Sequence, residues 1–166
     1  STPFCGAAEL PTYDSGNPTA HEQLMLELVN RARANPSAEA DRFGIGLNEG
    51  LAPGTIDNQP KPPLALHPAL INAARKHTAW MLANDVFSHT GAGGSGSHDR
   101  MEAAGFDFSG FWSSSENIAI GQTSGIPKLT RETIARHESL FRSAVHRVNI
   151  CGAATNRIGL GISSGE

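Results

Sequence analysis

Residues 64–91 read LALHPALINAARKHTAWMLANDVFSHTG, and this stretch carries more information about the fold than any other. It opens with a short extended run at 64–66, and Pro68 then suits the first position of a helix. Small and apolar residues recur on one face of this helix: Leu70, Ile71, Ala74, Thr78, Met81 and Leu82. The basic run at 75–77 argues against a membrane span. The pattern therefore predicts an extended segment and a helix, with His89 just beyond the helix's C-terminal end.

A second helix is predicted upstream, beginning near Thr19. This threonine lies three residues before Glu22, which is the spacing of a capping box. The apolar stripe of the helix consists of Leu24, Met25, Leu28, Val29 and Ala32. Pro36 predicts the end of the helix, because the residue before a proline avoids the α region. Ser37 is then expected to cap a short helix that stops before Gly44.

Beyond a glycine-rich loop the pattern predicts two more helices and two strands. Ser97 is expected to cap a helix over 98–104, and residues 116–120 have the pattern of a short strand. Thr130 is expected to cap a longer helix, which carries on or beside its packed face Ile134, His137, Glu138 and Phe141. Alternation with small residues predicts a strand with one packed face at Ile158, Leu160 and Ile162. Helices alternating with a few short strands predict an α+β layered domain.

The composition indicates one globular domain that binds no nucleic acid. The chain has 166 residues, of which 39% are hydrophobic and 17% charged, which is too apolar for a disordered chain. The net charge is −3, and the basic residues are scattered among acids instead of forming the basic face that displaces counterions. Proline and glycine make residues 1–17 an N-terminal arm, which leaves 18–166 as the domain. The chain starts at Ser1, as expected either for a mature protein or for a piece of a longer one.

The two cysteines, Cys5 and Cys151, leave two interpretations open. In an oxidising compartment a disulfide would tie the arm to the C-terminal segment and close a long loop. Alternatively, both are unpaired, partly buried thiols, because spacing says nothing about proximity.

Histidines beside loops suggest a metal site, because imidazole and carboxylate groups suit Zn²⁺. His89 follows a helix, Glu116 opens a predicted strand, and His146 lies on a later segment. Only the fold can bring these three together. His137 is expected on a packed helix face, where a hydrogen-bonded core role and a cleft role are equally plausible. Glu138 is either a partner that orients a histidine or a solvated residue.

Two familiar patterns fail in this chain. The glycines at 91–96 have the GxGxxG spacing, but they follow a helix and not a strand, which argues against a dinucleotide site. His137-Glu138 begins like the HExxH motif of zinc proteases, but Phe141 stands where the second histidine would be.

Taken in order, several short segments resemble the bacterial branch of the CAP superfamily, which joins cysteine-rich secretory, antigen 5 and pathogenesis-related 1 proteins. The resemblance spans about 22–163, and its segments are Leu28-Val29-Asn30-Arg31-Ala32-Arg33, the run from Pro63 to Leu70, Phe87-Ser88-His89-Thr90-Gly91, Asp99-Arg100, Ala104-Gly105-Phe106, Ser115-Glu116-Asn117-Ile118-Ala119, Leu140-Phe141-Arg142-Ser143, His146-Arg147-Val148-Asn149-Ile150 and Ile158-Gly159-Leu160-Gly161-Ile162.

The resemblance implies a three-layer αβα sandwich with a small central antiparallel sheet. It implies a cleft with two histidines and two acids, and it places His89, Glu116 and His146 there. At the position of the second acid this chain has Ser143, and His137 is the candidate to fill that gap, with Glu138 as another. The chain also ends before the family's last strand, so the domain is either truncated or has one strand fewer.

The resemblance also implies function. We expect a secreted, monomeric binding module whose cleft takes a divalent metal, first of all zinc, and a lipid, sterol or peptide ligand. The alternative is a metal-dependent hydrolase that uses Glu116 as general base on a metal-bound water. A third interpretation is a structural domain in which the histidine and glutamate side chains only stabilise the fold.

Overall fold

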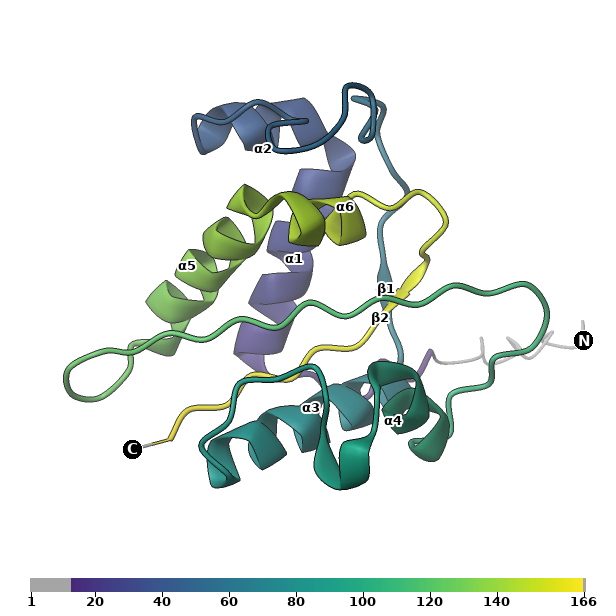
Figure 1. Cartoon of the computed structure of the whole chain (residues 1–166), viewed down its shortest axis with the longest axis vertical. Coiled ribbons are helices and arrows are strands. Elements are labelled where there is room, and N and C mark those ends of the chain that lie inside the picture. Colours follow the sequence, from purple (N-terminus) through teal and green to yellow (C-terminus); the bar gives the residue numbers. More distant parts are fainter. Residues whose placement is uncertain (1–12, 166) are drawn as a thin grey trace, which may run out of the picture.

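The computed structural model describes residues 13–165. Its elements are α1 (Ala20–Ala34), α2 (Pro36–Arg42), β1 (Ala65–Leu66), α3 (Pro68–Ala83), the 3₁₀ turn η1 (Ala92–Gly94), α4 (Ser97–Ala103), α5 (Leu129–Arg142), α6 (Ala144–Ile150) and β2 (Arg157–Ile158). Figure 1 shows α1, α2, α5 and α6 on one side of the short strand pair and α3 with α4 on the other. The predicted α+β class is confirmed.

The strand pair differs from the expected sheet in one respect. β1 and β2 run parallel, with Ala65 opposite Arg157 and Leu66 opposite Ile158. The expectation of an antiparallel sheet is therefore wrong for this pair. The two strands are separated by about ninety residues of helix and loop, and a crossover of that kind permits parallel pairing.

Helix α1 forms as its sequence predicts. The Thr19 side chain accepts a hydrogen bond from the Glu22 N–H, and the Glu22 carboxylate accepts one from the Thr19 N–H, which completes the capping box. The helix ends at Ala34, just before Asn35 and Pro36. Its buried face consists of Glu22, Met25, Leu28, Val29, Ala32 and Arg33. This face packs on α5, so the first and fifth helices share the main core.

Three predicted helix caps are wrong. Asn35, and not Ser37, caps α2, because Pro36 takes the first helical position and the Asn35 side chain accepts from the N–H of Ala38. Ser97 is the first residue of α4, and Thr130 is the second residue of α5. In each case the helix begins one or two residues earlier than the position of the serine or threonine predicted.

Residues 116–120 form no strand, which contradicts the sequence pattern. They are extended but make no backbone hydrogen bond with another backbone group in residues 13–165. The C-terminal strand is also shorter than predicted, because only Arg157 and Ile158 pair with β1.

The predicted alternation at 158–162 is nevertheless present in the packing. Ile158, Leu160 and Ile162 pack against the core between α1 and α5. Gly159 and Gly161 face the other way, where a Cβ would overlap the backbone of α3 at Leu70 and Ala74. The segment thus lies between the two helical layers, and its glycines allow it to contact α3 backbone to backbone.

Two fully buried arginines hold distant segments together. The Arg33 guanidinium donates to the carbonyls of Pro62, Ile150, Gly152 and Thr155 at 2.8–3.1 Å. Arg147 donates in the same manner to the carbonyls of Leu47, Phe141, Arg142 and Glu49. Each arginine therefore satisfies carbonyl groups that loops and helix ends would otherwise leave buried without partners.

Cys151 is buried beside this core, and burial raises the pKa of its thiol to about 11. Cys5, its partner in the disulfide interpretation, lies outside the described residues, as does most of the 1–17 arm. The disulfide and the arm therefore remain predictions. Within residues 13–165 no helix is long and apolar enough to cross a membrane.

Candidate functional site

His89 lies on a loop that the end of α3 positions. After Ala83 the chain turns through Asp85, which has a positive φ of 51°. The buried imidazole of His77 lies 2.9 Å from the carbonyl oxygen of Ser88 and anchors the loop one residue before His89. The His89 side chain itself is 57% exposed, so it is open to a ligand from solvent.

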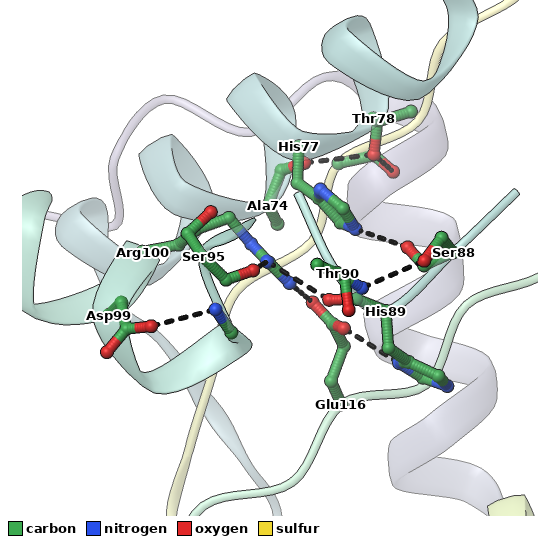
Figure 2. Close-up of polar contacts among 12 residues, drawn as sticks. Ala74, His77, Thr78, Ser88, His89, Thr90, Ser95, Asp99, Arg100 and Glu116 are labelled. Atoms are coloured by element: carbon green, nitrogen blue, oxygen red, sulfur yellow. Dashed lines mark hydrogen bonds and ion pairs between the residues drawn. The ribbon is translucent and has the colours of Figure 1, made fainter. Parts of the chain in front are cut away.

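Glu116 meets His89 from the other side of the site, on the extended segment after α4. One carboxylate oxygen lies 2.8 Å from Nδ1 of His89, and the other lies 2.6 Å from the Arg100 guanidinium (Figure 2). Two of the three predicted cleft residues, 27 positions apart in the chain, are therefore in direct contact.

Arg100 organises this contact, and the sequence analysis gave it no role. Besides its ion pair with Glu116, it donates hydrogen bonds to the carbonyls of His89 at 3.1 Å and Ser95 at 2.7 Å. It thus fixes the His89 backbone and the Glu116 side chain at the same time (Figure 2). The only signal in the sequence is its place in the Asp99-Arg100 segment of the resemblance, and that names no partner.

His146, on the first turn of α6, is brought near the pair by an amide relay. Asn117 donates to the His146 carbonyl at 3.1 Å, and Asn149 donates to the Asn117 side chain at 2.7 Å. Burial lowers the pKa of His146, and the neighbouring charge of His89 lowers it further.

His137 belongs to the core between α2 and α5. Its side chain is 1% exposed, and Nε2 lies 2.8 Å from the Glu39 carboxylate. The rings of Phe43 and Phe141 surround it. None of its hydrogen bonds with residues 13–165 reaches the other three candidates.

The candidates for the second acid lie apart from this network. Glu138 forms an exposed ion pair with Arg142 one turn along α5. Ser143 precedes α6 and makes no capping hydrogen bond through its side chain.

The donor atoms are of the types that bind zinc, but the side chains are not arranged around an ion. Imidazole and carboxylate groups are Zn²⁺ ligands, and the lowered pKa keeps His146 neutral and able to coordinate near pH 7. Among residues 13–165, however, no group of three or more His, Cys, Asp or Glu side chains has metal-binding geometry. Arg100 and His89 hold both oxygens of Glu116, so a metal ion would have to displace one of them.

Glu116 also lines a large cleft between the two helical layers. The cleft has a volume of about 1720 Å³. Its walls include α3 on one side, α1 and α5 on the other, and the extended segments 113–123 and 157–165.

The sequence was also compared with known proteins. The model of the CAP family, described as the cysteine-rich secretory protein family, matches residues 26–166. No curated protein and no solved structure matched the chain. The family match covers all the residues of the candidate site.

Proposed function

The chain belongs to the CAP family of cysteine-rich secretory proteins, and from this premise we propose that it is a secreted interaction module whose cleft binds a divalent metal ion, first of all zinc. His89, Glu116 and His146 would hold the ion. A lipid or peptide ligand would bind in the adjoining cleft.

The direct contact between His89 and Glu116 carries the proposal. Two residues that sequence spacing alone could not connect lie 2.8 Å apart, in a position open to solvent. His146, neutral because of its lowered pKa, would complete a set of two imidazoles and one carboxylate. When bound, zinc would act as a Lewis acid and attract an anionic or carbonyl group of a ligand.

Arg100 would support the site in either state. Without a metal it neutralises Glu116, and it keeps its hydrogen bonds to the carbonyls of His89 and Ser95 independently of that carboxylate. The His89 loop would therefore stay in place if Glu116 turned toward an ion.

Zinc titration by calorimetry tests the proposal. Wild-type protein should bind one Zn²⁺, and His89→Ala and His146→Ala should each weaken binding by about tenfold or more, because each removes a ligand. His21→Ala removes a histidine of α1 whose nearest polar partner is Thr130, and it serves as the matched control. If all three variants bind zinc as the wild type does, the metal proposal is wrong. If the wild type itself binds no zinc and His89→Ala and His146→Ala only lower the melting temperature, the cluster is structural.

The hydrolase alternative has less support. A general base needs a free lone pair near the metal-bound water, whereas both oxygens of Glu116 are engaged. Zinc-dependent turnover of an ester or peptide panel, lost in Glu116→Gln, would establish it in place of the binding module.

Secretion is part of the same proposal. CAP domains are generally extracellular, and the family match is what supports this location.

A further inference from the structure

A second, smaller pocket lies between α3 and α4, beside the 3₁₀ turn η1. All of its lining residues lie between positions 73 and 104, so it includes no part of the extended segments 107–127 and 157–165. Ala73, His77 and Arg100 line both this pocket and the large cleft and form the wall between them. The small pocket has a volume of about 190 Å³. A cavity of about 150 Å³ holds a benzene ring, so this space suits a group of that size.

The polar groups open to this pocket are mainly donors, and no acidic residue lines it. The side chains of Lys76, Trp80 and Ser95 have no hydrogen-bond or ion-pair partner within residues 13–165. An ammonium, an indole N–H and a hydroxyl can each donate. The Ser88 carbonyl places the ring hydrogen of His77 on Nε2, so Nδ1 is an unpaired acceptor, but this atom is buried and not open to a ligand. A matching ligand must therefore supply hydrogen-bond acceptors.

Arg100 adds a further donor to the wall of this pocket. Its Nη1 donates to the carbonyls of His89 and Ser95, and its Nη2 donates to Glu116. Its Nε–H has no partner in the part of the chain that the structure describes. Because Glu116 neutralises Arg100, the exposed ammonium of Lys76 supplies the net positive charge of the pocket. The matching acceptor is therefore an anionic group.

The rest of the wall is apolar. Alanines at 73, 103 and 104 leave the space open, and the indole of Trp80 borders it. Trp80 stacks on the imidazole of His77, with ring centroids 5.9 Å apart and 12° between the ring planes, which holds the indole in place. A bare inorganic anion would leave these apolar surfaces uncovered, whereas a neutral hydrocarbon would bury the donors without acceptors. A small carboxylate attached to an aromatic ring satisfies both parts of the wall.

We propose that the pocket between α3 and α4 binds a free small molecule that carries a carboxylate on an aromatic ring. The ring lies against Trp80, and the carboxylate accepts hydrogen bonds from Lys76, Ser95 and Arg100. The inference goes beyond the proposed function, because it requires neither zinc nor an occupant of the large cleft. Arg100 also holds Glu116, so the ligand lies one side chain away from the candidate metal site.

Titration with benzoate, followed by NMR, tests the proposal. The protein is freed of metal on a chelating resin, placed in Tris buffer, which contains no carboxylate, and observed through the indole N–H signals of its two tryptophans. Benzoate should shift the Trp80 signal saturably, and Trp112, which does not line the pocket, is the internal reference. Benzyl alcohol keeps the ring without the charge, and acetate keeps the charge without the ring. Each should bind at least about tenfold more weakly than benzoate.

Two results of these titrations would overturn the proposal. One is the absence of a saturable shift of the Trp80 signal with benzoate. The other is binding of benzyl alcohol or acetate as tight as that of benzoate, because the pocket would then recognise only a ring or only a charge.

Two matched pairs of variants locate the ligand. Lys76→Met removes the charge at the pocket and should weaken benzoate binding about 3- to 5-fold. Lys128→Met removes an exposed lysine just before α5 and should have no effect. Ala103→Leu fills the space for the ring and should abolish binding. Ala79→Leu adds the same side chain at an exposed position of α3 outside the pocket and should bind as the wild type does.

These variants keep the inference falsifiable and separate from the zinc site. Lys76, Ala103 and Ala79 are exposed, so their substitution should leave the fold intact. Unchanged benzoate binding in either Lys76→Met or Ala103→Leu would place the ligand elsewhere and refute the proposal. His146→Ala lacks a proposed zinc ligand and should bind benzoate as the wild type does, so failure of the zinc titration leaves this test intact.

Discussion

Buried charges at single positions hold much of this structure together, and Glu39 is the clearest case. Its carboxylate is 2% exposed and accepts hydrogen bonds from His137 and Arg31. Although burial acts to raise its pKa, these hydrogen bonds and the charges behind them hold that pKa at about 2.

Glu39→Gln should therefore destabilise the protein by about 3 kcal/mol at pH 7, because it leaves His137 and Arg31 facing an uncharged group. Glu138→Gln, which breaks an exposed pair with Arg142, should cost less than about 1 kcal/mol. Urea denaturation of both variants measures the difference. Equal destabilisation by the two variants would mean that the buried contacts of Glu39 stabilise the protein no more than the exposed ion pair of Glu138 does.

The same carboxylate predicts an acid response. Its pKa is lower in the folded state than the ordinary 4.5, so its contribution to stability is full above about pH 4.5 and is lost as the pH falls toward 2. Glu39→Gln should flatten this part of the wild-type profile of unfolding free energy against pH. A variant profile as steep as that of the wild type would contradict the assignment.

Cys151 should be almost inert in the folded protein. With its pKa raised to about 11, its thiolate fraction at pH 8 is lower than that of an ordinary thiol by a factor on the order of 100. In a Cys5→Ser background, Ellman's reagent should titrate no thiol in the native protein and one in denaturant. Rapid reaction of the native protein would show that the thiol is accessible. Non-reducing mass spectrometry of the wild type would decide whether the two cysteines pair.

At the residue scale the sequence indicates which residues lie in the site better than it indicates which residues they contact. His89 and Glu116, which it selected, lie in contact, but it gave no role to Arg100, which binds both. The contacts of Arg100 with His89 and Glu116 depend on where α4 places the Arg100 side chain relative to two loops. Residue spacing within α4 does not determine that placement. His137 was left open between core and cleft, and its contact with Glu39 depends on how α2 packs against α5.

At the scale of elements, periodic segments were predictable and hydrogen-bonded edges were not. The helices at 20–34 and 68–83 follow from apolar spacing and from caps or prolines. The strand predicted at 116–120 is absent, because a strand requires a partner that local sequence does not supply. Caps failed where two polar residues competed for one helix start, as at Asn35 and Ser37.

The contact between 158–162 and α3 gives a prediction at this scale. Gly161→Ala would place a Cβ 2.6 Å from backbone atoms of Ala74 and Arg75, and Gly159→Ala would overlap the Leu70 carbonyl. Each should destabilise the protein by about 1–3 kcal/mol. Gly46→Ala, whose added Cβ would lie 3.7 Å from its nearest neighbour, is the control. Differential scanning fluorimetry should show lower melting temperatures for the first two variants only, and an unchanged Gly159→Ala would refute the close contact.

At the scale of the whole molecule, stability should be distributed unevenly. The core between α1 and α5 is well packed, whereas residues 107–127 have few backbone hydrogen bonds. Amide hydrogen exchange should therefore be slowest in α1 and α5 and fastest in 107–127, by several orders of magnitude. Slow exchange throughout 107–127 in the protein alone would indicate that these backbone groups already have partners.

For the whole molecule, the order of elements along the chain was predictable, and the orientation of strands far apart in the sequence was not. The α+β class follows from the succession of elements, and the family follows from many short segments in order. The parallel orientation of β1 and β2 was missed, because it depends on the path of ninety intervening residues.

The four backbone carbonyl groups that accept hydrogen bonds from Arg33 have a consequence for synthesis of the protein. Helix α1 leaves the ribosome early, but three of the four oxygens that its guanidinium needs belong to residues 150–155. Until those residues emerge, closing the core would bury a cation without partners, at a cost of several kcal/mol. The nascent chain must therefore keep this face of α1 unburied until residues 150–155 have left the ribosome.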